Sequence, residues 1–303
     1  MVMNKTVLGV YPHPEGHWVG DGFPVRSLFT YDKFGQQLSP FLLLDYAGPA
    51  QFPAAANPRG VGEHPHRGFE TVTIVFQGEV AHRDSAGNSG IIGPGDVQWM
   101  TAAAGILHEE FHSPAFTKKG GALEMAQLWV NLPARHKMSP PRYQTILNRD
   151  IPQAALESGA GSVRVIAGHY KGVAGPAATF SAMNVWDVRL EAHRHAILSV
   201  PEGHTAAIAV LRGTIAANGS RQAKDAELVV FERGGTEIEI EAAADSTLLF
   251  LSGAPIPEPI VGYGPFVMNS RQEIETAMSD FSLGKFGRMP SLQGNLAGGA
   301  AGS

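Results

Sequence analysis

The chain has 303 residues, a formal net charge of −5 and 44% hydrophobic residues, which is enough for one large or two ordinary globular domains with real cores. It contains no cysteine, so disulfides, thiolate metal ligands, iron–sulfur clusters and a cysteine nucleophile are excluded. No cluster of lysine and arginine stands out, which argues against nucleic acid or an anionic membrane as the main partner.

The N-terminal segment, "MVMNKTVLGVYPHPEGHW", lacks a long apolar stretch followed by a small-residue cleavage site. The longest apolar segments, such as "PFLLLDYAG", are too short to span a bilayer. We therefore expect a cytoplasmic protein that does not enter a membrane.

Short runs rich in valine, isoleucine, threonine and phenylalanine follow one another along the chain, separated by many of its 36 glycines and 21 prolines. "TVTIVF", "DVQWM", "SVRVIAG" and "TEIEIEA" are examples, and in the last of these Ile238 and Ile240 alternate with glutamates. Many short strands with glycine turns predict an all-β sandwich or barrel.

Two pairs of polar residues in the first half have the spacing of neighbours on one strand face. "GVGEHPHRGFETVTIVFQG" carries His64 and His66, and "PGDVQWMTAAAGILHEEF" ends on His108 and Glu110. Side chains at i and i+2 of a strand project together. If the two strands face each other inside one small barrel, they present three imidazoles and one carboxylate to a common point.

That donor set indicates a metal site, with hydrogen bonding of four polar core residues as the alternative. Three nitrogens and one oxygen leave two octahedral positions open, which would admit a substrate oxygen or O₂. Imidazole with carboxylate suits Fe(II), and also Mn, Ni, Cu, Co or Zn, and ligand type alone does not choose among them.

The identity of the carboxylate is open on spacing alone. Glu70 has the same parity as the two histidines before it, provided that no bulge intervenes, so it rivals Glu110 as a ligand. Glu109 has the wrong parity to share a face with His108, and we expect His112 to be peripheral.

The second half resembles the first. "HRGFETVTIVFQGEVAHRDSAG" aligns without gaps on "PEGHTAAIAVLRGTIAANGSRQ", which places Gly78 on Gly213, and a weaker match places Gly95 on Gly235. We predict two related β-barrel domains, at residues 1–145 and 146–288, followed by a flexible Gly/Ala/Ser-rich tail at 289–303.

The second domain lacks the metal pattern. In the first alignment His64 and His66 fall on Ser199 and Pro201, and no histidine follows His204. The one other close pair, His193 and His195, is expected on the surface or in a loop. We therefore expect the second domain to be metal-free.

One helix is predicted in "NSRQEIETAMSDF", where Ser270 precedes Glu273 by three residues as in a capping box. Its apolar stripe has helical spacing and comprises Ile274, Ala277, Met278 and Phe281.

"PFLLLDY", "HPHRGFETVTIVFQG", "PGDVQWMTAAAGILHEE", "QLWVNLP" and "GPFVMN" together resemble the pirin family of the cupin superfamily, over about residues 20 to 285. The resemblance implies two tandem cupin β-barrels, a bicupin, with a short C-terminal helix and with metal, commonly iron, only in the N-terminal barrel. The family's ligands correspond to His64, His66, His108 and Glu110, which favours Glu110 over Glu70.

The resemblance also implies two functions. Some pirins resemble quercetin 2,3-dioxygenases, which cleave a flavonol with O₂ and release carbon monoxide. Animal pirin is instead associated with transcriptional co-regulation as an iron-dependent redox sensor, which would require a protein partner.

As a mechanism we expect the metal to bind the deprotonated 3-hydroxyl of a flavonol or a related enediol or phenol, with Glu110 able to take the hydroxyl proton. Apolar walls are expected from residues whose alternative role is ordinary core packing, namely Phe41, Trp99, Met100, Met125 and Trp129.

Overall fold

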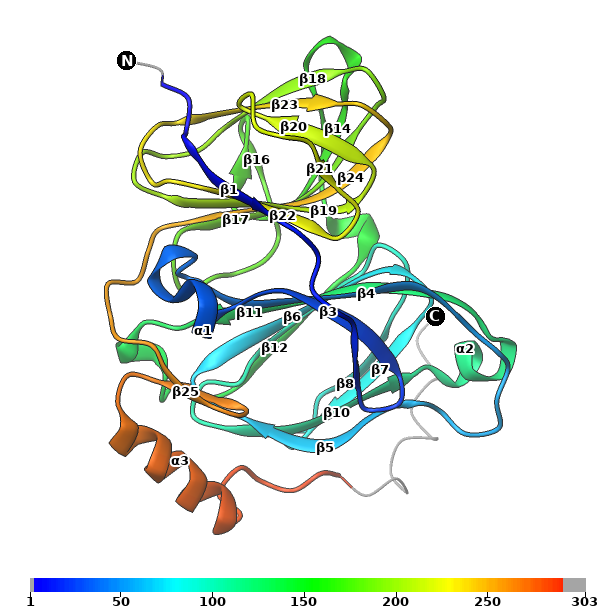
Figure 1. Ribbon diagram of the computed structural model, residues 1–303. Helices are drawn as coiled ribbons and strands as arrows, with labels where there is room; N and C mark the ends of the chain where they lie inside the picture. The colour runs from blue at the N-terminus through cyan, green and yellow to red at the C-terminus, as the bar shows by residue number, and fades with distance from the viewer. Residues whose placement is uncertain (1–2, 291–303) are drawn as a thin grey trace, which may run out of the picture.

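Two antiparallel β-barrels stack on each other in the computed structural model, which describes residues 3–290 (Figure 1). Each barrel consists of a seven-stranded and a four-stranded sheet. The predicted fold class is confirmed: the chain is mostly β, with two cupin-type domains and few helices.

The first barrel holds the predicted metal pattern. Its large sheet has the order β12-β9-β6-β11-β4-β3-β2, with β2 (His17–Val19), β3 (Phe23–Thr30), β4 (Phe41–Phe52), β6 (Phe69–Gln77), β9 (Val97–Thr101), β11 (Gly121–Asn131) and β12 (Arg142–Ile146). Its small sheet has the order β5-β10-β7-β8, with β5 (Gly60–His66), β7 (Val80–Asp84), β8 (Ser89–Ile92) and β10 (Ile106–His112).

The second barrel repeats this plan. Its large sheet has the order β1-β22-β19-β24-β17-β14-β13, with β1 (Val7–Tyr11), β13 (Gln153–Ala155), β14 (Gly161–Ala167), β17 (Met183–Leu190), β19 (Thr205–Arg212), β22 (Glu227–Phe231) and β24 (Ser246–Gly253). Its small sheet has the order β18-β23-β20-β21, with β18 (His195–Ser199), β20 (Thr214–Ala217), β21 (Ala223–Lys224) and β23 (Glu237–Ala242).

The remaining elements are short. Two small hairpins are formed by β15 (His169–Tyr170) with β16 (Val173–Ala174) and by β25 (Val261–Tyr263) with β26 (Phe266–Met268). The helices are α1 (Tyr31–Phe34), α2 (Pro114–Lys119) and α3 (Arg271–Ser282), with 3-10 turns η1 (Gly35–Gln37), η2 (Ala134–His136), η3 (Asn148–Asp150) and η4 (Glu157–Gly159). Within residues 3–290, no helix has the length and apolar character needed to cross a membrane.

The shared strand order tests the internal match. β6 and β19 occupy the same place in their sheets, as the first alignment predicts. The second alignment, with Gly95 on Gly235, is wrong, because it sets β9 on β23. In the structure β9 and β22 hold the same place in the two large sheets, and β10 and β23 hold the same place in the two small sheets. Alternating apolar strands after a glycine turn resemble one another, so this part of the sequence could be aligned one strand out of place.

The two ends of the chain cross between the barrels. β1 adds to β22 at the edge of the second barrel's large sheet, the place that β12 takes in the first. The C-terminal segment returns to the first barrel, where Val267 donates its backbone N–H to Arg67 O at 3.0 Å. The predicted boundary near residue 145 stays a prediction, and this exchange of ends is a feature that it did not include.

The two large sheets face each other. Their contact is one hydrophobic core that contains Val72 and Leu128 from the first barrel and Ala207 and Leu249 from the second. Because strand side chains alternate, the other face of β6 points into the first barrel.

The predicted helix is confirmed as α3, which packs beside the first barrel (Figure 1). Ser270 caps it by accepting the Glu273 N–H at 3.3 Å. Ile274 and Ala277 are buried, but Met278 and Phe281 are 42% and 41% exposed, so only half of the predicted stripe is covered. Most of the predicted tail, residues 291–303, lies outside the described residues.

Candidate metal centre

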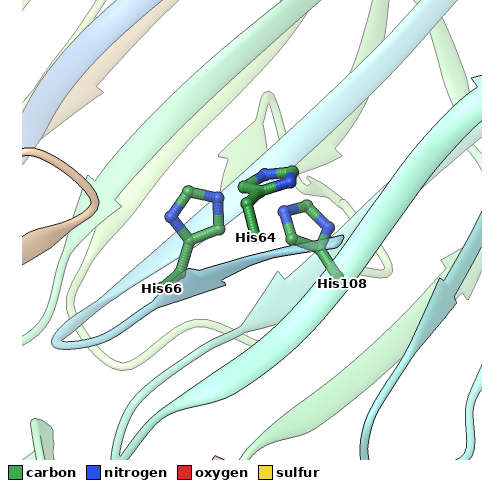
Figure 2. Close-up of side chains that lie close together, drawn as sticks. All are labelled: His64, His66 and His108. Carbon is green, nitrogen blue, oxygen red and sulfur yellow. The ribbon is translucent and has the colours of Figure 1, made fainter. Parts of the chain in front are cut away.

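Three histidines from β5 and β10 lie close together in the first barrel (Figure 2). β5 and β10 pair antiparallel with His64 opposite His108, and His66 lies two residues further along β5 on the same face. The ring centroids are 4.2 Å apart for His64 and His108, 4.8 Å for His66 and His108, and 4.9 Å for His64 and His66. One nitrogen from each ring lies within 4.8 Å of the others.

The nitrogens of this triad are available as ligands. The Nδ1 of His64 lies 2.8 Å from Gly62 O, to which its N–H donates, so its Nε2 carries the lone pair. The Nδ1 of His66 and the Nε2 of His108 are buried and have no hydrogen-bond partner. Buried polar atoms without partners are rare, and a divalent cation would satisfy them.

Electrostatics favour the same conclusion. Burial, followed by the neighbouring histidines, holds the pKa of His66 and of His108 well below the usual value. Both rings are therefore neutral near pH 7, as a metal ligand must be. His64 is half-buried and gives the triad an opening toward solvent.

Glu110 lies beside His108 but not in the same group as the triad. Its carboxylate accepts from Thr73 Oγ1 at 3.2 Å and from Gln127 Nε2 at 2.8 Å. It forms a second group of possible donors with His108 and His82, which the sequence analysis did not single out. Its role as a ligand therefore stays a prediction.

Glu70 is on the opposite side of the sheet. Its ladder partners are Thr101 and Val130, and its carboxylate accepts from Thr101 Oγ1 at 2.7 Å. It shares a face with Val72, which lies in the core between the barrels. The parity argument that made Glu70 a rival is wrong, because a bend at Gly68, with φ of +93°, separates β5 from β6.

The other two doubtful residues are placed as predicted. Glu109 pairs with Arg83 away from the triad. His112 is peripheral: it packs against Phe52 and Phe116 and contacts Gly22 O at 2.9 Å through Nε2.

The apolar walls are only partly where they were expected. Trp129 lies 5.4 Å from His66, centroid to centroid, and stacks on Phe69 at 4.3 Å. Phe41 and Trp99 are not walls of the site, because their side chains lie in the core between the barrels. Met100 packs near Tyr143, and Met125 lies in a separate core cluster of the first barrel.

The candidate site residue that sequence reasoning missed is His82. It is buried on β7 opposite Glu110, and its Nδ1 lies 3.5 Å from the Nδ1 of His108. A lone histidine in "EVAHRDS" has no spacing signal. Only its alternation with Val80 and Asp84, which are also buried, indicates that its side chain faces the barrel interior.

The second barrel has no such centre among its described residues. Its matching ladder sets Leu198 opposite Ile238 and Ala217 opposite Ile240, all of them buried and apolar. His193 and His195 are exposed, as predicted.

The strand order and the triad define the class of the protein as a bicupin with a metal-type donor cluster in one barrel. The family model "Pirin" matches residues 22–130, and the model "Pirin C-terminal cupin domain" matches residues 185–287. The chain belongs to the pirin family.

Individual relatives span almost the whole chain. A Pseudomonas aeruginosa protein named "Putative quercetin 2,3-dioxygenase" is 61% identical over 282 residues, covering 93% of this chain and 98% of its own. A tomato (Solanum lycopersicum) "Pirin-like protein" is 38% identical and covers 90% of both chains. The crystal structure of a quercetin 2,3-dioxygenase from Acinetobacter baumannii has a TM-score of 0.92 at 53% identity, covering 94% of this chain and 99% of its own.

Proposed function

We propose that this protein is a metal-dependent dioxygenase that cleaves a flavonol such as quercetin with O₂. The observation that carries the proposal is the triad of converging imidazoles, two of them with buried nitrogens that have no partner, behind a half-buried His64. The similarity to proteins named as quercetin 2,3-dioxygenases supports the choice of reaction.

The proposed ligands are His64, His66, His108 and Glu110, with Fe(II) as the ion and Mn, Ni, Co, Cu and Zn as the alternatives to test. When bound, the ion would acidify the flavonol 3-hydroxyl, hold its oxygen and supply the electronic chemistry for reaction with O₂. Glu110 would reach the ion by turning about its own side chain, since it already lies beside His108.

Residues of the chain would perform the remaining tasks. Glu110 is the candidate base for the hydroxyl proton, because Thr73 and Gln127 hold its carboxylate inside the barrel next to the triad. Trp129, which is only partly buried and stacks on the buried Phe69 beside His66, offers a flat apolar surface against which an aromatic ring could lie.

The test is turnover under air. We expect Fe(II)-loaded protein to consume quercetin, as measured by the loss of its visible absorbance and by the release of carbon monoxide. We expect His64→Ala to abolish both signals. The absence of turnover with all six metals, in protein shown by elemental analysis to contain the ion, would reject this substrate. Iron binding that changes capture of a protein partner between Fe(II) and Fe(III), without O₂ consumption, would favour the redox-sensor function instead.

A further inference from the structure

A line of buried polar side chains continues inward from His108. The Nδ1 of His108 lies 3.5 Å from the Nδ1 of His82, and the Nε2 of His82 lies 3.5 Å from Asp84 Oδ2. Gln98 Nε2 also lies 2.9 Å from the Nδ1 of His82. All four of these residues are buried inside the first barrel.

Asp84 is a fixed charge at the inner end of this line. Its Oδ1 accepts the backbone N–H groups of Ala86 at 2.9 Å and Asn88 at 3.0 Å, so the β7–β8 turn holds it in place. Burial opposes ionisation, but the nearby His82, 3.5 Å away, and the hydrogen bonds from Asn88 outweigh it and lower the pKa of Asp84. A carboxylate in this position favours an N–H on the neighbouring ring nitrogen that faces it.

One proton assignment satisfies these contacts. The carboxylate favours an N–H at Nε2 of His82, which leaves Nδ1 of that ring as the acceptor. This acceptor faces the Gln98 amide and the Nδ1 of His108, and therefore favours an N–H at Nδ1 of His108. The Nε2 of His108, buried and without a partner, is left with its lone pair.

We propose that Asp84 and His82 are positioning residues that hold His108 in the tautomer whose Nε2 is free to bind a metal ion. A ligating histidine commonly donates its second N–H to an acceptor such as a carboxylate or a carbonyl, which fixes the ring and raises its basicity, and the Nδ1 of His82 would be the acceptor here. Tyr143 stacks on His82 with ring centroids 5.1 Å apart and planes at 19°, and so fixes the plane of the positioning ring.

The second barrel shows that the fold does not require this pair. Its β20 carries Ala217 where β7 carries His82, and Ile238 stands where β10 carries His108. The β20–β21 hairpin closes without a buried carboxylate and imidazole. The triad and the positioning pair are thus present together in one barrel and absent together from the other, as expected if they serve the same centre.

The experiment compares His82→Phe with His112→Phe. The first variant keeps an aromatic ring against Tyr143 but removes the acceptor, and the second makes the same chemical change at a buried histidine further along β10. Co(II) affinity is measured by chelator competition. We expect His82→Phe to bind Co(II) roughly 10- to 100-fold more weakly, Asp84→Asn to lose less, and His112→Phe to bind as the wild type does.

A second readout needs no metal and no turnover. Nitrogen-15 NMR of the metal-free wild type should show His108 with its proton on Nδ1, and His82→Phe should lose that preference. The proposal rests on the proposed metal site, but this tautomer measurement can fail or succeed independently of catalysis.

Three outcomes would overturn the proposal: equal Co(II) affinity in the wild type and folded His82→Phe, a wild-type proton on Nε2 of His108, or a second equivalent of Co(II) that His82→Phe loses. The last would make His82 a ligand. If His82→Phe does not fold, Asp84→Asn carries the same comparison, and unchanged affinity and tautomer in that variant would be equally decisive.

Discussion

In the first barrel the ladder between β5 and β10 sets His64 opposite His108, whereas in the second the matching ladder between β18 and β23 sets Leu198 opposite Ile238. Both barrels close with the same strand order, so closure does not depend on what these positions carry. The difference separates a barrel interior filled by apolar packing from one that gathers metal-type donor groups.

The second interior is continuous apolar packing. Trp186 stacks on Phe250 at 4.8 Å within a cluster of buried aliphatic side chains. The first interior instead holds a triad, two carboxylates and several amides and hydroxyls, some of them without partners. Buried polar groups stabilise a fold only when they are paired, so we expect the first barrel to gain stability when an ion binds at the triad.

The largest effect is expected from making the first barrel like the second. His108→Ile places in β10 the residue type that Ile238 supplies in β23, so the barrel should still fold. Metal affinity should fall by more than about 100-fold, because a ligand is lost rather than a supporting residue. Elemental analysis after dialysis measures it. Ile238→Val is the matched control and should keep its ion, and retention of the ion by His108→Ile would show that the triad is not the site.

The reverse experiment weakens the second barrel only. Phe250→Ala removes a buried ring that packs on Trp186, and such changes cost about 3–5 kcal/mol of unfolding free energy. Denaturant unfolding should show this loss, while the metal content of the folded variant should stay that of the wild type. Loss of metal from folded Phe250→Ala would mean that the two barrels are not separable in function.

A third difference lies in the large sheets that face each other. There β6 buries Glu70, whereas the aligned residue of β19 is Thr205. Burial raises the pKa of Glu70 from 4.5 to about 7, although Thr101 donates to it. The native state therefore binds more protons between those values, and the free energy of unfolding should fall as the pH rises through that window.

Glu70→Gln removes this dependence. Relative to the wild type, the variant should gain about 3 kcal/mol of unfolding free energy between pH 4 and pH 8. Urea unfolding of both proteins at the two pH values measures the difference. Parallel behaviour of wild type and variant would indicate that Glu70 has an ordinary pKa.

The smallest expected effect separates the two carboxylates. Glu110→Gln should weaken Co(II) binding by roughly 10- to 100-fold, less than His108→Ile, because the amide keeps an oxygen donor and loses only the charge of the carboxylate. Glu70→Gln should leave Co(II) binding unchanged, since Glu70 faces away from the triad. Chelator competition on both variants measures the two Co(II) affinities. A larger loss of affinity in Glu70→Gln than in Glu110→Gln would indicate that Glu70 is the carboxylate ligand.

Much of the centre could be predicted because it follows from local spacing. His64 and His66 share a strand face, and His108 arrives on a neighbouring strand after a short bend, as periodicity predicts. Helix α3 was predictable from its cap at Ser270, which is also a local signal.

The errors came from features that periodicity does not record. The bend at Gly68 reversed the face of Glu70 relative to the preceding strand. Trp99 was predicted in the barrel interior but lies in the core between the barrels. Both faces of a doubly covered sheet are apolar, so the sequence pattern does not tell one face from the other. The crossing of the chain ends depends on long-range strand pairing, which no short segment encodes.

The most direct test of the central claim is a crystal structure of Fe(II)-loaded protein with anomalous data at the iron edge. We predict one peak per chain, enclosed by His64, His66 and His108, with the carboxylate of Glu110 turned toward it. An anomalous map without a peak at the triad, or with an equal peak inside the second barrel, would contradict the account.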